Sequence, residues 1–272
     1  MVQGLTEFIP VSSTAHLILA PRFLGVAMPA HPHTYDTVIQ AGTLLPVFAY
    51  FRHDWARLAG AAVRMLRRRR LGEDPCERLA LFLGLGTLPA LVAGALLHSR
   101  VEVLGDPEAN PIALLVIGLS LVIVALAMWL AEVLSGSGRE EADLRQSDAW
   151  TVGLAQAVAI IPGVSRSGAT ITAGIFAGLS RPAAARFSFL LMAPVMVAAT
   201  AFGGLKLWQS PEPVSPAEWQ SLALGALVAA VVGYAAIAWL LRFLRRNALY
   251  PFVVYRCILG GYLIALYLLG GR

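Results

Sequence analysis

The side chains that could do chemistry gather in two short segments. The first, QGLTEFIPVSSTAH (residues 3–16), carries a glutamine, a glutamate, a histidine and several hydroxyls around one proline. The second, PGVSRSGATI (162–171), places an arginine between two serines, with glycines on both flanks. Both segments lie in otherwise apolar stretches, where ionisable groups are costly and therefore usually functional. We take them as the two parts of one candidate site.

Spacing assigns roles within the first segment. Gln3 and Glu7 lie four residues apart, so on a helix they share one face. After the proline, Ser13 and His16 lie three apart and share another face, which predicts that His16 accepts the proton of Ser13. Ser12 points about 100° away on an ideal helix and is the better helix cap. Glu7 would hold a metal ion or set the local charge.

The second segment is typical of an anion site. Gly163 and Gly168 let the backbone turn tightly, and successive amides before a helix form a nest that binds anions. Arg166 adds a planar guanidinium, whose fork suits phosphate. An ion pair between Arg166 and Glu7 that is only structural stays open as an alternative.

Together these groups favour hydrolysis of a phosphoester or a diphosphate. A hydroxyl near an imidazole can attack phosphorus, and an arginine with backbone amides can neutralise the oxygens of the transition state. A second mechanism stays open, in which Glu7 and a metal activate water and Ser13 only binds the phosphate. The sequence has no Walker loop, HExxH or CxxC motif.

Composition places this chemistry in a membrane. Of 272 residues, 58% are hydrophobic and only 14% are charged, which leaves too little polar surface for a soluble domain. Strand-like alternation is not seen, so we predict an all-α integral membrane protein. The first apolar stretch lacks a basic region and contains Glu7, so we expect it to stay in the fold. About six ranges approach the roughly 20 residues that a membrane crossing takes: 35–51, 79–97, 111–134, 183–203, 219–241 and 250–269.

The charges orient these spans. The net charge is +5, and arginines crowd the loop that contains residues 52–70. By the positive-inside rule this loop is cytoplasmic, whereas the more acidic loops 98–110 and 206–219 lie outside, as do both termini. The arginine run has no interleaved aromatic residues, so we expect no nucleic-acid binding, although contact with anionic lipid headgroups is expected. The two cysteines, Cys76 and Cys257, indicate no disulfide framework.

Two stretches, 1–25 and 150–180, fall outside the predicted spans, and each has a proline near its middle. Each must return to the side of the membrane from which it enters, because the flanking loops would otherwise not lie on the sides that their charges predict. We therefore interpret both as re-entrant hairpins of two half-helices, which are tolerated at membrane depth only where protein buries them or they line a cavity.

The hairpins belong to an internal repeat. EFIPVSSTA resembles AIIPGVSRSG, and GTLLPVFAY resembles LLMAPVMVA further along the chain. Three predicted crossings separate the two hairpins, so the second half would lie upside down relative to the first. This pattern predicts an inverted-topology repeat of residues 1–149 and 150–272, with broken helices meeting near the midplane at a shared site.

The two motifs resemble the signature regions of the bacitracin-resistance type of undecaprenyl-diphosphate phosphatase, (E/Q)GxTEFxPxSSxxH and PGxSRSGxT. The resemblance continues through YDTVIQAGTLLPV and RFSFLLMAPVM and covers nearly the whole chain. It implies hydrolysis of the C55 lipid diphosphate to its monophosphate at the extracytoplasmic side of the bacterial inner membrane. This reaction recycles the cell-wall lipid carrier. The resemblance also implies a divalent cation, Mg²⁺ or Ca²⁺.

Residue roles follow from the resemblance. Glu7 is similar to the essential acid, and Gln3 to a variable Glu/Gln partner at the metal. Ser13 looks like the proposed nucleophile, His16 like the conserved histidine and Arg166 like the diphosphate-binding arginine. The further polar and glycine positions implied in substrate binding are Ser12, Thr14, Gly163, Ser165, Ser167 and Gly168.

The chain departs from the family pattern in three respects. Ala15 stands where glycine is common. Gln3 in place of glutamate removes one possible carboxylate ligand of the metal. Relatives extend further before the first motif, so we expect a short first half-helix.

Two other functions stay open. A polyprenyl-phosphate transporter, or flippase, is suggested by the inverted repeat, and a purely structural membrane protein is disfavoured by the two polar motifs. The expected partners are the polyprenyl diphosphate substrate and membrane lipids, and a homodimer stays open. Phosphate release from a lipid diphosphate would separate an enzyme from a transporter.

Overall fold

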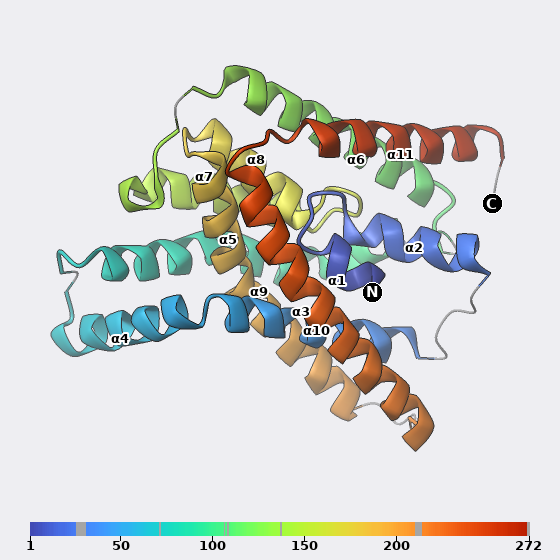
Figure 1. The fold of residues 1–272 in the computed structure, drawn as a ribbon. Coiled ribbons are helices and arrows are strands. Elements are labelled where there is room, and N and C mark those ends of the chain that lie inside the picture. The colour runs from blue at the N-terminus through green and yellow to red at the C-terminus, as the bar shows by residue number, and fades with distance from the viewer. Residues whose placement is uncertain are drawn as a thin grey trace.

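The computed structural model describes residues 1–25, 31–70, 72–105, 107, 109–136, 138–209 and 214–270, and their regular structure is helical (Figure 1). In chain order the elements are α1 (Val2–Thr6), α2 (Ser13–Leu24), α3 (Pro32–Tyr50), α4 (Arg52–Arg68), α5 (Pro75–Gly105), α6 (Ala113–Leu134), the 3-10 turn η1 (Glu141–Asp143), α7 (Gln146–Val158), α8 (Arg166–Phe176), α9 (Arg181–Gln209), α10 (Pro216–Leu244) and α11 (Tyr250–Leu268).

Five helices of the described residues are long and apolar enough to cross a membrane: α5 over Pro75–Leu97, α6, α9, α10 and α11. They coincide with five of the predicted spans and confirm an all-α membrane protein. The remaining predicted span, 35–51, corresponds to helix α3, which is not in this set. The count of six crossings therefore stays a prediction.

The two leftover stretches each form a pair of helices joined by a turn. Helices α1 and α2 flank the turn at Pro10, and α7 and α8 flank the turn at Pro162. Proline lacks an amide proton and disfavours helical geometry in the residue before it, so each apolar stretch is interrupted at this point. The pairs of half-helices are as predicted, whereas their re-entry from one side of the membrane stays a prediction.

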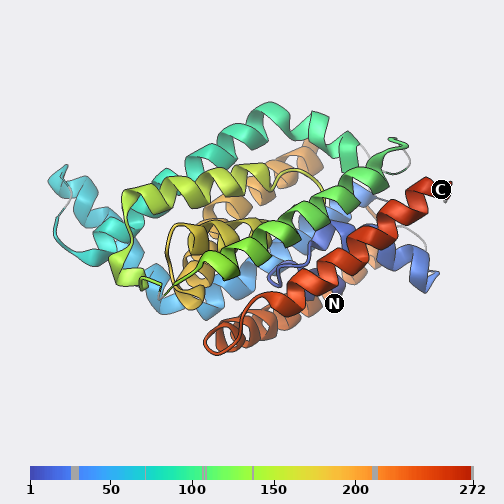
Figure 2. The same ribbon diagram turned by 90° about the horizontal axis from the view of Figure 1, so that it is seen from above.

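Several helix contacts recur in the two halves. Helix α1 packs on α10 as α7 packs on α5, and α3 packs on α10 as α9 packs on α5. Helices α3 and α9, whose internal Pro46 and Pro194 come from the repeated apolar segments, pack on each other. Helices α6 and α11 also lie side by side (Figure 2). The inverted repeat stays a prediction. It is supported by these matching contacts, in which helices of each half pack on a helix of the other half.

Helices α6 and α11 run in opposite directions. Gly118 of α6 lies against Gly260 of α11, and Glu132, near the other end of α6, accepts a hydrogen bond from the amide of Leu249 just before α11 begins. Equivalent membrane helices that pack antiparallel are related by an axis in the membrane plane. This is the geometry expected of halves with opposite topology.

Small residues allow the closest helix crossings. A Cβ atom on Gly86 of α5 would lie 2.9 Å from the carbonyl oxygen of Ala149 on α7. The corresponding crossing of α1 on α10 is closer still, because a Cβ on Gly4 would lie 2.5 Å from the carbonyl oxygen of Ala229. Membrane helices associate through such close backbone contacts, since hydrocarbon gives them no hydrophobic drive to pack.

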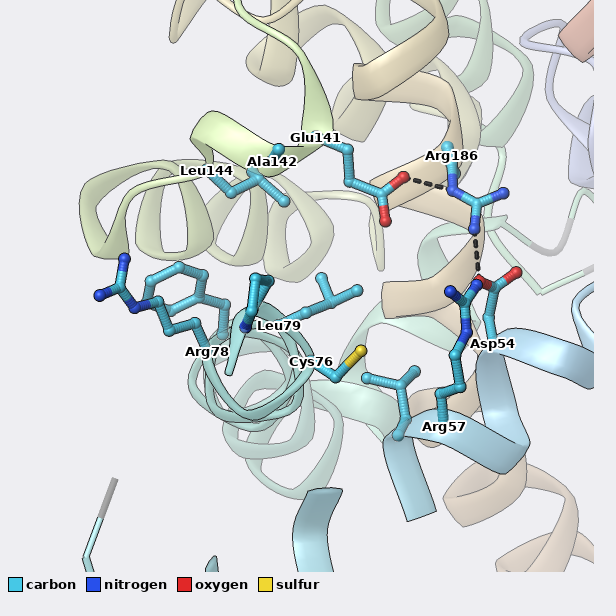
Figure 3. A pocket seen from close by; sticks show the side chains of 12 residues that line it. Asp54, Arg57, Cys76, Arg78, Leu79, Glu141, Ala142, Leu144 and Arg186 are labelled. Carbon is cyan, nitrogen blue, oxygen red and sulfur yellow. Dashed lines mark hydrogen bonds and ion pairs between the residues drawn. The ribbon is translucent and has the colours of Figure 1, made fainter. Parts of the chain in front are cut away.

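A charged junction ties together α4, α9 and η1, beside a cavity of about 250 Å³ that α5 also lines (Figure 3). Arg186 of α9 binds Asp54 at 2.6 Å and also Glu141, and Arg57 binds Asp54 at 2.6 Å. Burial raises the pKa of Glu141, and the Arg186 charge opposes that rise. The two arginines, Arg57 and Arg186, compensate the carboxylates of Asp54 and Glu141, so we assign this junction a structural role.

Glu132 forms a second ionic junction. Its buried carboxylate accepts bonds from Arg181 Nε at 2.8 and 2.9 Å, from Arg181 Nη2 at 2.5 Å and from the Leu249 amide at 2.8 Å. It therefore joins α6 to α9 and to the start of α11. A buried carboxylate with charged and amide donors is satisfied, whereas the same group without Arg181 would be strongly destabilising.

Candidate functional site

The two turns have the same local design. Ser12 before α2 and Ser165 before α8 both have left-handed backbones, with φ of 75° and 70°. The Oγ atom of each accepts the amide three residues on, from Ala15 at 3.5 Å and from Gly168 at 3.2 Å. Ser12 is thus the cap that the spacing predicted. The first amides of each half-helix have no carbonyl one turn earlier to bind, so both helix starts can bind an anion.

Glu7 collects three polar groups at the first turn. Its Oε2 accepts bonds from Gln3 Nε2 and from Ser13 Oγ, both at 2.9 Å. Its Oε1 lies 3.9 Å from Nη2 of Arg166, which comes from the second turn. The predicted shared face of Gln3 and Glu7 is confirmed. The carboxylate is only 8% exposed, so the two motifs meet at a buried charge.

His16 is held by two other groups. Its Nδ1 lies 2.7 Å from the Ser12 carbonyl oxygen, which can only accept, so Nδ1 carries the proton. Its Nε2 lies 2.5 Å from the Tyr255 hydroxyl, and the two rings stack at 5.6 Å. Ser13 therefore bonds Glu7 rather than His16, because both ring nitrogens are already engaged. A role for His16 as the acceptor of the Ser13 proton stays a prediction.

The turns also touch through Ser167. Its hydroxyl donates to the carbonyl of Ile9 at 3.3 Å and lies 3.3 Å from Oγ of Ser165. Ser167 is 1% exposed, whereas Thr14 on α2 is exposed. The binding roles predicted for these residues stay predictions, and the structure places Ser165 and Ser167 at the junction of the two turns.

The predicted glycines have packing roles of their own. Gly163 has φ of 88°, and a Cβ there would lie 2.6 Å from the carbonyl oxygen of Ile117 on α6. A Cβ on Gly168 would lie 3.2 Å from Oγ of Ser165 and 3.3 Å from Nη1 of Arg256. Gly163 must be glycine because of its backbone conformation and its contact with α6, whereas a methyl group on Gly168 would require small shifts of the Ser165 and Arg256 side chains. Their roles in substrate binding stay predictions.

Sequence reasoning missed Arg256 on α11. Its side chain is 0% exposed, and its guanidinium donates only to backbone carbonyls. An arginine inside the apolar range 250–269 was the available signal, because such a charge is costly in a membrane. Its five acceptors are the carbonyl oxygens of Pro10 (3.3 Å), Ser120 (3.5 Å), Leu121 (3.3 Å), Gly163 (3.1 Å) and Val164 (3.0 Å).

Comparison with known proteins identifies the family. Residues 1–262 match the family model described as bacitracin resistance protein BacA. The chain belongs to the BacA family. Over 99% of its length it is 45% identical to the undecaprenyl-diphosphatase of Anaeromyxobacter sp. (strain K), covering 90% of that protein. It is 39% identical to the undecaprenyl-diphosphatase of Pelobacter propionicus, with 99% and 95% of the two chains covered. It is 40% identical to that of Synechococcus elongatus, with 97% and 89% covered.

Two buried polar atoms of this BacA-family site have no protein partner among the described residues. They are Oε1 of Gln3 and Nη1 of Arg166, which belong to the side chains that flank Glu7. Buried polar groups are normally hydrogen-bonded. An acceptor and a cationic donor left open beside one carboxylate are suited to a cation and an anion, respectively.

The oxygen atoms near Glu7 suit a hard divalent cation. The carboxylate, the open amide oxygen of Gln3 and the hydroxyl of Ser13 are ligand types that Mg²⁺ and Ca²⁺ prefer. The described residues hold no cluster of three or more His, Cys, Asp or Glu side chains. Mg²⁺ is commonly bound through one or two carboxylates together with substrate phosphates. The residues present fit this mode.

Proposed function

We propose that this protein is a phosphatase that hydrolyses undecaprenyl diphosphate to undecaprenyl phosphate and inorganic phosphate. The observation that carries the proposal is the contact of Glu7 with both Ser13 and Arg166 where the two turns meet. A carboxylate, a hydroxyl and a guanidinium are thereby gathered beside two helix starts. Membership of the BacA family and the names of the relatives support the same lipid substrate.

In this proposal Ser13 is the nucleophile. Its Oγ attacks the terminal phosphorus, and its proton passes to Oε2 of Glu7, to which the hydroxyl already donates. The phosphoanhydride bond breaks, and undecaprenyl phosphate leaves with the bonding electron pair. Water then hydrolyses the phosphoserine, which releases inorganic phosphate and restores the hydroxyl. The rival route, direct attack by water, would leave Ser13 as a binding group only.

Arg166 and the helix starts bind the diphosphate in this proposal. The open Nη1 of Arg166 provides a charged donor, and the first amides of α2 and α8 provide neutral ones. Ser12 and Ser165 hold the two helix starts in shape through their caps. These donors are fixed before substrate arrives, so they need not reorganise when charge builds up on the phosphoryl oxygens.

His16 takes a supporting role here. The Ser12 carbonyl and the Tyr255 hydroxyl orient its ring, and through them it links the first turn to α11. To accept the Ser13 proton at Nε2, His16 would have to release Tyr255. The geometry therefore favours Glu7 as the proton acceptor.

A divalent cation, Mg²⁺ or Ca²⁺, would be held by Glu7 and Gln3 together with the substrate's phosphates. When bound, it would supply positive charge to the phosphate oxygens. The open Oε1 of Gln3 supports this assignment.

The cellular setting follows from the same reading. We place the protein in the bacterial inner membrane, with its active site open to the extracytoplasmic side, recycling the cell-wall lipid carrier and conferring bacitracin resistance. The uneven distribution of arginines supports this orientation. A homodimer stays a prediction.

The deciding experiment is phosphate release from undecaprenyl diphosphate by the purified full chain in detergent with Mg²⁺. Glu7→Gln, which keeps the size of the side chain and removes its charge, is the matched control. Release by the wild-type protein and its loss in Glu7→Gln are expected. If the wild-type protein releases no phosphate but moves labelled lipid between the leaflets of vesicles, the phosphatase assignment fails and the transporter reading replaces it.

A further inference from the structure

Arg256 is a buried charge with no carboxylate partner in the described part of the chain. Its side chain is 0% exposed, and all five of its hydrogen bonds go to neutral carbonyl oxygens. The junction at Glu132 is built differently, since the partly exposed guanidinium of Arg181 binds a buried carboxylate there. Burial of a cation without a counter-ion costs free energy, so a purely structural role does not account for an arginine at this position.

The carbonyls that Arg256 binds come from both halves of the chain. Pro10 belongs to the first turn, and Gly163 and Val164 belong to the second. The remaining contacts, to Ser120 and Leu121, fix the guanidinium to α6. One planar group therefore sets the separation of the turns that carry Glu7 with Ser13 and Arg166.

The same bonds orient the turn backbone. In a trans peptide the C=O and N–H bonds point in opposite directions. When Arg256 draws the Val164 carbonyl toward itself, the amide of Ser165 must point away from it. Arg256 thus acts on the start of α8, at the nest that would bind the diphosphate, without donating to it directly.

We propose that Arg256 is a positioning residue for diphosphate hydrolysis, which holds the two turns in register and whose charge is compensated by the bound diphosphate. The inference rests on the proposed function. Around the junction of the turns, the described site has one carboxylate, Glu7, and two guanidiniums, Arg166 and Arg256. The excess positive charge favours an anionic headgroup.

The test compares Arg256→Lys and Arg256→Gln with wild-type protein in detergent. Lysine keeps the charge but cannot span five carbonyls, so the two turns should lose their relative position. A misplacement of about 1 Å can lower the rate about 100-fold, so we expect a fall in kcat of about that size and a smaller change in KM. Glutamine also removes the charge, so kcat falls and KM rises together. The control is Arg181→Gln, which breaks an ionic junction away from the turns.

A second measurement separates positioning from stability. Inorganic pyrophosphate with Mg²⁺ serves as a headgroup probe, and its effect on the melting temperature is recorded for each variant. We expect wild-type protein and Arg181→Gln to be stabilised by pyrophosphate, even though Arg181→Gln melts lower. Arg256→Gln should lose that stabilisation. This readout needs no turnover, so it tests Arg256 even if the wild-type protein fails to hydrolyse the lipid.

The outcomes are distinct. Wild-type kcat, KM and pyrophosphate stabilisation in Arg256→Gln would overturn the proposal, and so would equal kcat losses in Arg256→Gln and Arg181→Gln. If neither Arg256 variant folds, Gly168→Ala decides. Its methyl group would crowd Nη1 of Arg256 at 3.3 Å while the charge remains. The same methyl group would also meet Oγ of Ser165 at 3.2 Å, so Ser165→Gly, which removes that atom, is the control. A folded Gly168→Ala protein that loses more kcat than Ser165→Gly would support the proposal, and wild-type kcat or an equal loss in the two variants would overturn it.

Discussion

Ser13 shares the carboxylate of Glu7 with Gln3, and this shared contact makes the nucleophile testable at the scale of single residues. We expect Ser13→Ala to abolish hydrolysis, because the variant lacks the attacking hydroxyl. Lipid binding should be retained, because Arg166 and the helix starts supply most of the contacts with the diphosphate. The matched control is Ser12→Gly, since glycine accepts the φ of 75° and costs only a few tenths of a kcal/mol as a cap.

Trapping of the intermediate completes that prediction. Substrate with a labelled terminal phosphate should leave label on wild-type protein during turnover and none on Ser13→Ala. If Ser13→Ala keeps substantial activity, the covalent route is wrong and water attacks directly.

Arg166 differs from a simple ion-pair partner because Nη1 is left open while Nη2 approaches Glu7. Lysine would keep the positive charge but lose the fork that binds two oxygens. We therefore expect Arg166→Lys to melt like wild-type protein and to lose about 10²–10³-fold in kcat, the range seen when one preorganised donor is removed. Enzyme assays with a parallel melting curve measure both quantities. Near-normal kcat would mean that Arg166 only pairs with Glu7.

Gln3 offers a test of the cation. Replacing the open amide oxygen by a carboxylate should strengthen metal binding, so Gln3→Glu is expected to reach half-maximal activity at a lower Mg²⁺ concentration than wild-type protein. Removal of the metal by a chelator should stop hydrolysis in both, and Mg²⁺ should restore it. Full activity in the presence of a chelator would remove the cation from the proposal.

At the scale of helices, the close crossing of α5 on α7 depends on the glycine at position 86, which has no side chain. Gly86 and Gly84 lie on the same helix, but Gly86 faces α7 and Leu191 closely whereas Gly84 has open space around it. We expect Gly86→Ala to destabilise the protein by about 1–3 kcal/mol through overpacking, and Gly84→Ala to be neutral or slightly stabilising. Melting in detergent compares the two. Equal effects would show that this crossing tolerates a methyl group.

The helices were more predictable than their contacts. Hydropathy located the long spans, and Pro10 and Pro162 located the turns, because both signals are local in sequence. The bond between His16 and Tyr255 joins residues 239 positions apart, so spacing could not reveal it. For the same reason the spacing of Ser13 and His16 predicted a shared face but not that a distant tyrosine would engage the imidazole.

Helix α3 is a case in which hydropathy alone does not decide whether a helix crosses the membrane. It is a continuous helix that packs against α9 and α10, yet it is not among the helices that length and composition mark as candidate spans. Polar groups within a bundle can be satisfied by neighbouring helices. Whether such a helix crosses the membrane depends on its neighbours, which a single sequence does not show.

At the scale of the whole molecule, orientation in the membrane is the open prediction. After Cys76 and Cys257 are replaced, a cysteine at exposed Arg70 should be protected from an impermeant thiol reagent in intact cells, and one at exposed Ala217 should react. Labelling after lysis controls for intrinsic reactivity. The opposite labelling pattern would reverse the topology, and labelling of both sites in intact cells would rule out the predicted inverted repeat.

The matching turns divide the work of the two halves unequally. Ser13 and Arg166 each occupy the first position of a half-helix, directly after a serine with left-handed backbone. Two identical halves would place two serines or two arginines at this junction, and either pair would lack one of the groups that phosphoryl transfer needs. Under the predicted inverted repeat, the two halves would share a backbone design that binds an anion, and cleavage of that anion would depend on the position after each serine, at which the two turns differ.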